Sequence, residues 1–248
     1  MTGDVIHLWL VSWGAEGFKV YLRKPLSGGS FGVMCKGRIA EGEEPVDAAF
    51  RIAMRQIINN PERNANNERN SKRLEKKDLV LLPGRTEGEY VFMLKRRFEH
   101  YNTGAIKGEI TNVEIGKLWD YVIAGKDEYN IDLYELAMVK TYLRSDLPEE
   151  DEDAEFEIAQ LNMCEVANEF SMKNKKQLEM SSKCGCFGCV RIFEPSEIKE
   201  YIPGEDTAVC PYCGTDAVLG DYSGFDITEE FMKEMNEEMF GEIMGQND

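Results

Sequence analysis

Two Cys-x-x-Cys motifs in the second half of the chain constrain its fold more than any other feature. Twenty residues separate the first motif, which ends at Cys189, from the second, which begins at Cys210. Two intervening residues let the backbone wrap one edge of a metal ion, and two such turns supply four thiolates to tetrahedral zinc, leaving no open coordination site. The sequence therefore predicts one structural zinc ion with four cysteine ligands: Cys186, Cys189, Cys210 and Cys213.

The segment Cys184-Gly185-Cys186 leaves the identity of one of these ligands undecided. Cys184 competes with Cys186 for the metal, although the spacing favours Cys186. A redox-active pair is expected as a single motif in a βαβ pattern, and an iron–sulfur centre usually shows another cysteine spacing. We therefore expect a closed, structural site of the zinc-ribbon type, without catalysis at the metal.

Several whole-chain properties indicate a cytoplasmic protein. An odd count of seven cysteines, five of them within 30 residues, favours metal binding over a disulfide framework. The chain contains no run of 18 apolar residues, and its N-terminus lacks a basic segment followed by an apolar one. We expect neither a membrane-spanning helix nor a secretory signal, and no membrane partner.

Negative charge is concentrated in the last 100 residues. Residues 1–148 have a net charge of +1, whereas residues 149–248 have a net charge of −18. The change falls at Pro148, which precedes a run of carboxylates that repel one another and cannot pack. This run is either a solvated linker or the start of a charged helix. We place a boundary near residue 148 and expect two domains, 1–148 and 149–248.

The charge of the second half also predicts the kind of partner. An acidic surface repels a phosphate backbone, which argues against nucleic acid as a partner. The same surface would speed the encounter with a basic protein, which we expect to contact residues 149–157 or 226–242. The alternative is an acidic surface that serves solubility alone.

Regular elements are predicted on both sides of the cysteine motifs. Short strands are expected at residues 190–193 and 207–209, and helices at about residues 156–174 and at residues 226–244. The last helix is expected to begin with the capping pair Asp226 and Glu229. Its methionine-rich apolar face predicts that it covers the ribbon core, and an adaptable partner surface is the alternative.

From about Asn162 onward, the chain resembles a family of small, poorly characterised bacterial cytoplasmic proteins with a C-terminal zinc ribbon. The resemblance rests on residues 182–189, 192–193, 208–214 and 227–231, and it covers roughly a third of the chain. It implies zinc but no known activity.

The first half predicts a mixed α/β layer. Strands are expected at residues 5–11, 18–22, 78–82 and 90–94, with helices at residues 45–58 and 129–143. Pro45 suits the first turn of the former helix. Residues 28–32 are rich in glycine and predict a hairpin turn, and residues 59–77 predict a polar inserted loop. The fold class is therefore α/β, with helices flanking a mixed sheet.

Residues 36–51 resemble the first half of the Nudix box. That pattern begins with glycine, reaches glutamate after five residues and arginine after seven more, and Gly37, Glu43 and Arg51 fit it. The resemblance implies a Nudix-like fold. The family next needs carboxylates that bind magnesium, but other residues occupy their positions: Ile52, Arg55 and Gln56. We therefore expect no magnesium at this degenerate box.

The helix that follows the box loop carries an arginine where the family pattern has a carboxylate, and this positive charge predicts an anion as its ligand. Arg51 and Arg55 lie one helical turn apart and Arg38 precedes them in the loop, so that a phosphate or nucleotide can take the place of the metal. The candidate ligand-binding residues are Arg38, Glu43, Arg51 and Arg55.

These features favour a non-catalytic binding or regulatory protein, in which a pseudo-Nudix module is fused to an acidic zinc-ribbon module that contacts another protein. The alternative is a divergent Nudix-type hydrolase of nucleoside-diphosphate-linked substrates, with metal carboxylates from elsewhere: Glu41, Glu43, Glu44 or Glu89. The missing box carboxylates favour the first interpretation. His7 and His100 are expected to be structural.

Overall fold

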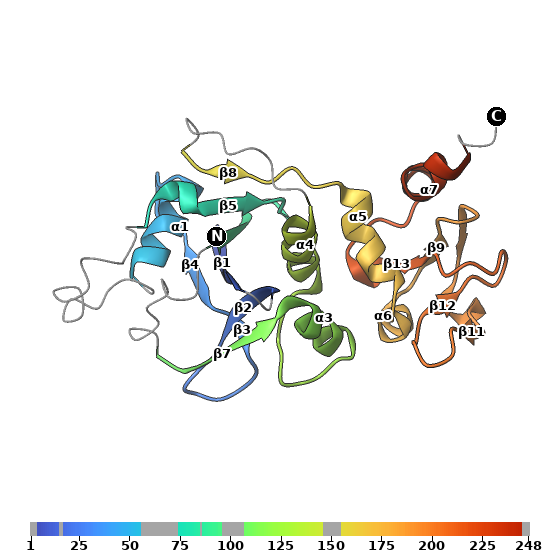
Figure 1. Ribbon diagram of the computed structural model, residues 1–248, viewed down its shortest axis with the longest axis horizontal. Helices are drawn as coiled ribbons and strands as arrows, with labels where there is room; N and C mark the ends of the chain where they lie inside the picture. The colour runs from blue at the N-terminus through green and yellow to red at the C-terminus, as the bar shows by residue number, and fades with distance from the viewer. Residues whose placement is uncertain are drawn as a thin grey trace. The chain divides into compact units, whose positions relative to one another are not determined.

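The computed structural model describes residues 4–14, 17–55, 74–84, 86–95, 107–145 and 155–244. The chain divides into two compact units (Figure 1). The first comprises Met1–Val122 and Asp127–Gln160, and the second comprises Ile123–Lys126 and Leu161–Asp248. Among the described residues, the first unit has one sheet and the second has two, and each unit has its own buried side chains.

The first unit is built on one mixed sheet. In the part of the chain that the structure describes, this sheet has eight strands, and its main path runs β3-β2-β1-β6-β5-β8, with β4 beside β1 and β7 beside β2. The strands are β1 (Val5–Gly14), β2 (Gly17–Lys24), β3 (Gly32–Val33), β4 (Cys35–Arg38), β5 (Leu79–Leu82), β6 (Glu89–Lys95), β7 (Glu109–Glu114) and β8 (Glu157–Ile158). Two pairs, β1–β6 and β5–β8, are parallel, and the others are antiparallel.

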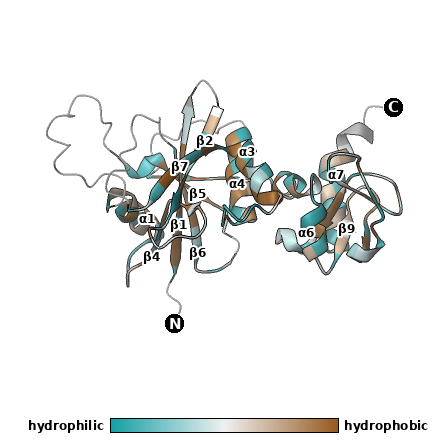
Figure 2. Cartoon of the chain, turned by 90° about the horizontal axis from the view of Figure 1, so that it is seen from below, coloured by the Kyte–Doolittle hydropathy of each residue, from teal (hydrophilic) through white to brown (hydrophobic). Residues whose placement is uncertain are grey.

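Helices cover both faces of this sheet because side chains along β1 alternate between them. Ile6, Leu8 and Leu10 point to one face, where they form a core with α1 (Pro45–Ala53). Trp9 points to the other face, and its Nε1 donates to Glu135 of α4 (Leu133–Arg144) at 2.8 Å. A further helix, α3 (Ile115–Ile123), follows β7. Figure 2 shows hydrophobic residues gathered in the strands and in α4.

The local elements of this unit agree with the sequence pattern. All four predicted strands are present, and residues 25–31, which include most of the predicted turn at residues 28–32, connect β2 to its antiparallel partner β3. The structure adds β4, β7 and α3, which the sequence did not indicate. The helix predicted at residues 129–143 begins later, at Leu133, because the side chain of Asp132 accepts the backbone N–H of Glu135. Residues 56–73, which hold most of the predicted polar loop, lie outside the described residues.

The first unit continues beyond Pro148, where we expected the boundary. Strand β8 pairs with β5, and Tyr142 donates a hydrogen bond of 2.6 Å to Glu157, so that the unit ends at Gln160. The helix predicted from residue 156 is wrong at its start, because residues 157 and 158 form strand β8. The helix begins at Met163, and the side chain of Asn162 caps it by accepting the backbone N–H of Cys164. The acidic run at residues 149–153 lies outside the described residues.

The second unit consists of small antiparallel sheets and short helices. Strand β9 (Cys184–Cys186) lies between β10 (Arg191–Phe193) and β13 (Val218–Gly220), and β11 (Glu200–Tyr201) pairs with β12 (Ala208–Val209). Strands β10 and β12 were predicted, whereas β9, β11 and β13 were not. The helices are α5 (Met163–Asn168), α6 (Lys175–Met180) and α7 (Glu229–Met244). The buried side chain of Asn174 joins these parts, since it donates to Val218 O (2.8 Å) and accepts from Ala208 N (3.0 Å).

Helix α7 covers the core of the second unit, as its methionine pattern predicted. Met232 and Met235 are fully buried. Gly185 of β9 has to lack a side chain, because a Cβ atom there would lie 2.7 Å from Sδ of Met232. The expected capping pair is wrong: the helix begins at Glu229, and the hydroxyl of Thr228 caps it by accepting the N–H of Phe231 at 3.1 Å.

The fold class is therefore confirmed: a mixed sheet between helices is followed by small sheets that carry the paired cysteines. Among the described residues, no helix combines the length and the apolar character that crossing a membrane requires.

Candidate functional site

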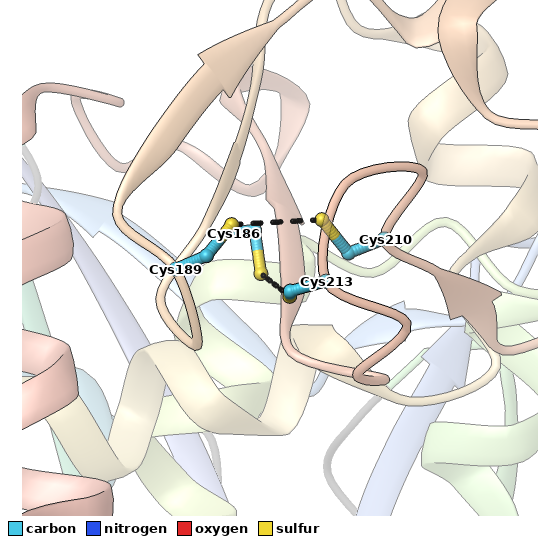
Figure 3. Close-up of side chains that lie close together, drawn as sticks. All are labelled: Cys186, Cys189, Cys210 and Cys213. Atoms are coloured by element: carbon cyan, nitrogen blue, oxygen red, sulfur yellow. Dashed lines mark hydrogen bonds between the residues drawn. The ribbon is translucent and has the colours of Figure 1, made fainter.

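Four cysteine side chains of the second unit converge on one point (Figure 3). The Sγ atoms of Cys186, Cys189, Cys210 and Cys213 all lie within 4.8 Å of one another. Cys186 and Cys213 are 3.6 Å apart, and Cys189 and Cys210 are 3.8 Å apart. A tetrahedral zinc ion with Zn–S bonds of about 2.3 Å places its sulfur ligands about 3.8 Å apart. The cluster thus has the size and the donor atoms of a four-cysteine zinc site.

Two short backbone turns hold these thiols, and we call them the first knuckle (residues 186–189) and the second knuckle (residues 210–213). The first follows β9 and leads into β10, and the second follows β12. The second knuckle is closed by the hydrogen bond from Gly214 N to Cys210 O at 3.0 Å. Gly214, directly beyond the knuckle, has a positive φ of +79°. Val190 adopts φ +60° at the same place beyond the first knuckle, which the sequence did not indicate.

Cys184 is not part of the cluster. It lies two residues before Cys186 in β9, where it is fully buried opposite Phe193 and Gly220. Two residues of strand span about 7 Å, which keeps the thiol of Cys184 in the core of the unit. Burial there raises its pKa to about 12. Of the two cysteines between which the sequence left the choice open, Cys186 is the one that lies in the cluster.

The protonation of the cluster is uneven. Burial raises the pKa of the Cys186 and Cys189 thiols above their ordinary value. Burial acts in the same direction on Cys213, but hydrogen bonds from the hydroxyl and the backbone N–H of Thr215 outweigh it, so that the pKa falls to about 7. Because a metal ion binds the thiolate form, its binding releases protons from these sulfur atoms.

A side chain from α7 braces the first knuckle. Asn236 donates from Nδ2 to the carbonyl oxygen of Phe187 at 2.6 Å, and the ring of Phe187 stacks on Phe240. No sequence pattern indicated Asn236, since it lies far from the cysteines along the chain and reaches them only through the packing of α7.

In the first unit, Glu43 and Arg51 of the segment that resembles half of the Nudix box form a doubly bonded ion pair. Arg51 donates from Nε to Glu43 Oε1 at 2.7 Å and from Nη2 to Oε2 at 2.6 Å. Arg51 also donates to the carbonyl oxygen of Arg38 at 3.0 Å, and Glu43 accepts the backbone N–H of Ala40 at 2.8 Å. The guanidinium of Arg51, followed by that N–H, lowers the pKa of Glu43 to about 2. The pair ties the loop after β4 to α1.

Ile52 is part of the core of the first unit. It is 3% exposed, and a Cβ atom at Gly37 would lie 2.5 Å from its Cδ1 atom. The first of the three positions without a carboxylate is therefore filled by a buried hydrocarbon that packs on the glycine of the box. Arg55 is exposed just beyond the end of α1 at Ala53, and Gln56 lies outside the described residues.

The carboxylates considered as replacements do not assemble into a metal site in the part of the chain that the structure describes. Among those residues, ligand atoms of three or more metal-binding side chains converge at the four cysteines and at no group of carboxylates. Glu43 is held by Arg51, and Glu89 accepts a hydrogen bond of 2.6 Å from Thr86. Glu41 and Glu44 belong to no such group among those residues.

His7 and Glu135 contact each other on the face of the sheet opposite α1. The Nδ1 atom of His7 is hydrogen-bonded to Oε1 of Glu135, whose other oxygen accepts from Trp9. Glu135 is 8% exposed, so the contact joins β1 to α4 from within. This agrees with the structural role expected for His7, whereas His100 lies outside the described residues.

No protein-family model and no curated protein matches the sequence. Distant similarity is found to solved structures. A MutT/nudix family protein from Enterococcus faecalis is 14% identical, with a TM-score of 0.32 over 45% of this chain and 43% of that one. A protein from Deinococcus radiodurans is 16% identical, with a TM-score of 0.34 over 49% of this chain and 71% of that one. An Ap4A hydrolase of C. elegans, in a binary complex, is 11% identical, with a TM-score of 0.35 over 57% of this chain and 98% of that one. The chain thus spans less than half of the Enterococcus protein, and likeness at this level assigns neither an activity nor a substrate.

Proposed function

We propose that the protein is a non-catalytic binding protein, in which a pseudo-Nudix module is joined to an acidic zinc-ribbon module. The observation that carries this proposal is the burial of Ile52 against Gly37. A carboxylate at this position would lose its hydration without gaining a partner. The box helix therefore serves packing where a Nudix hydrolase needs a magnesium ligand, and we expect no magnesium there.

Zinc is the proposed cofactor of the second module. The four thiolates Cys186, Cys189, Cys210 and Cys213 would hold it, and the ion would act as a structural cross-link between the two knuckles. Their soft sulfur ligands favour zinc over magnesium or calcium. Reduced cysteines also accord with the cytoplasmic location that we propose. Metal analysis of protein purified without chelator should return one zinc per chain, and its absence would contradict the assignment.

An anionic ligand, such as a nucleotide or a phosphate, is proposed for the first module. Of the candidate residues, Arg38 and Arg55 are exposed, whereas Arg51 and Glu43 are joined to each other. Arg55 and Arg38 would meet the phosphate, and the pair of Glu43 and Arg51 would hold the loop in place.

The test separates binding from turnover. The whole protein is incubated with ADP-ribose, a dinucleotide and a nucleoside triphosphate, with and without magnesium, while binding and hydrolysis are measured. We expect binding without turnover, and we expect Arg55→Ala to weaken it more than Lys117→Ala, which removes an exposed charge outside the box. Magnesium-dependent hydrolysis that Glu43→Gln abolishes would instead establish the divergent hydrolase.

A basic protein is the proposed partner of the acidic module. Exposed carboxylates line the outer side of α7, among them Glu230, Glu234 and Glu237, and a field of this sign speeds association with a basic surface. The full chain should retain its partner at low salt and lose it when these three residues are changed to glutamine or when residues 149–153 are neutralised. Retention by both variants would leave solubility as the role of the charge.

A further inference from the structure

The two knuckles place different residues at equivalent positions. Two residues beyond the last cysteine of each knuckle stand Arg191 and Thr215. Each of these side chains contacts the opposite knuckle. The guanidinium of Arg191 lies 4.7 Å from the ring centre of Tyr212, in the second knuckle, and Thr215 contacts the first knuckle at Cys186. Two side-chain contacts therefore join the knuckles: Arg191 with Tyr212, and Thr215 with the thiol of Cys186.

The hydroxyl of Thr215 lies between sulfur atoms from both knuckles. Its Oγ1 atom is 3.1 Å from Sγ of Cys213 and 3.5 Å from Sγ of Cys186, and these two sulfur atoms are 3.6 Å apart. The backbone of Thr215 is fixed as well, since its carbonyl oxygen accepts the N–H of Cys210 at 2.8 Å. The backbone hydrogen bond and the two sulfur contacts together hold the hydroxyl at the cluster.

The first knuckle leaves room for this hydroxyl. Gly188 of that knuckle faces Thr215, and a Cβ atom on it would lie 2.5 Å from Oγ1. Any other residue at this position would push the hydroxyl away from the sulfur atoms. The glycine between Phe187 and Cys189 is therefore matched to the side chain of Thr215 in the second knuckle.

We infer that Thr215 is a positioning residue of the metal site, and this inference rests on the metal proposed above. When the thiols are deprotonated, the hydroxyl donates its one hydrogen bond to the sulfur of Cys213 or, after rotation, to that of Cys186. Four thiolates around one divalent ion leave a net negative charge, and a donor to sulfur stabilises it in a partly buried site. The same contact keeps the sulfur atoms of the two knuckles at ligand spacing before the ion arrives.

The experiment compares Thr215→Val with Thr215→Ser in the full chain. Valine keeps the branched shape but removes the donor, whereas serine keeps the donor. Zinc affinity is measured by competition with a chelator, and the sulfur-to-metal absorption band is recorded after replacement by Co²⁺. We expect Thr215→Val to weaken zinc binding about tenfold and to move the band to longer wavelength, because its sulfur lone pairs are less stabilised. Thr215→Ser should stay close to the wild type in both measurements.

Thr207→Val is the matched control in the same unit. Its hydroxyl is buried and accepts the backbone N–H of Lys173 at 2.9 Å, away from the sulfur atoms. This variant should lower stability but leave the Co²⁺ band where it is. The inference is overturned if Thr215→Val leaves affinity and band unchanged, if Thr215→Ser is as impaired as Thr215→Val, or if Thr207→Val shifts the band equally. Failure of the wild-type protein to bind zinc would refute the proposed metal itself, which is a separate result.

Discussion

Ile52 packs so closely on Gly37 that a Cβ atom at residue 37 would lie 2.5 Å from the Cδ1 atom of Ile52. The contact joins strand β4 to helix α1 at the place where the box pattern departs from that of a Nudix hydrolase. A glycine and a branched hydrocarbon are complementary in shape at this point of the fold.

Ile52→Glu should therefore destabilise the first unit without creating a magnesium site. Burying an unpaired carboxylate at a position that is 3% exposed is expected to cost about 3 kcal/mol or more. Urea unfolding measures the change, and Arg55→Glu, at an exposed position just beyond the end of α1, should stay within about 0.5 kcal/mol of the wild type. Equal stability of the two variants would show that Ile52 does not belong to the core.

Gly37→Ala tests the same contact from the other side. We expect it to lower the free energy of unfolding by about 1–3 kcal/mol, because the added methyl group overpacks the core. Ile52→Val shortens the side chain that the methyl group meets and should restore part of the loss in the double variant. A double-mutant cycle without coupling would contradict the packing described here.

The ion pair between Glu43 and Arg51 predicts an acid-sensitive contribution to stability. The folded state lowers the pKa of Glu43 to about 2, below the unfolded value of about 4.3. A lowered pKa gives stability that is present above the unfolded value and is lost as the pH falls from about 4 toward 2. Glu43→Gln should flatten the pH dependence of unfolding in this window, and Glu41→Gln, in the same loop, should not. Identical profiles for Glu43→Gln and the wild type would argue against the pair.

Val190 and Gly214 make a matched test of backbone strain beyond the two knuckles. Val190 has φ +60°, which a β-branched residue adopts only at a cost of about 1–3 kcal/mol. Val190→Gly should therefore raise the melting temperature of the second unit. Gly214→Val should lower the melting temperature. Because a Cβ atom at residue 214 meets nothing within 4 Å, this loss of stability would come from the positive φ of the backbone alone. A lower melting temperature for Val190→Gly would contradict this account.

Cys210→Ser and Cys184→Ser separate the ligand from the buried thiol. Cys210→Ser should lose zinc and unfold the second unit, because metal binding and folding are coupled. Cys184→Ser should keep a full complement of zinc, since Cys184 lies outside the cluster. Chelation of the wild type should reproduce the first result, while Cys35→Ser, in the core of the first unit, should leave zinc in place. Loss of zinc from Cys184→Ser alone would reassign the site.

The sequence by itself determined the features that depend on short spacings. Two residues between paired cysteines, the apolar period of α1 and the apolar run of β1 are local, so each predicts its knuckle, helix or strand without knowledge of the rest. Tertiary structure alone decided what depends on residues that are distant in the chain. Strand β8 joins the sheet because β5 offers it backbone partners, and Cys186, not Cys184, lies in the cysteine cluster because the turn that brings the thiols together begins at Cys186, at the end of β9. Thr215 meets the sulfur atoms for the same reason: its contact crosses from one knuckle to the other, and no spacing along the chain encodes that approach.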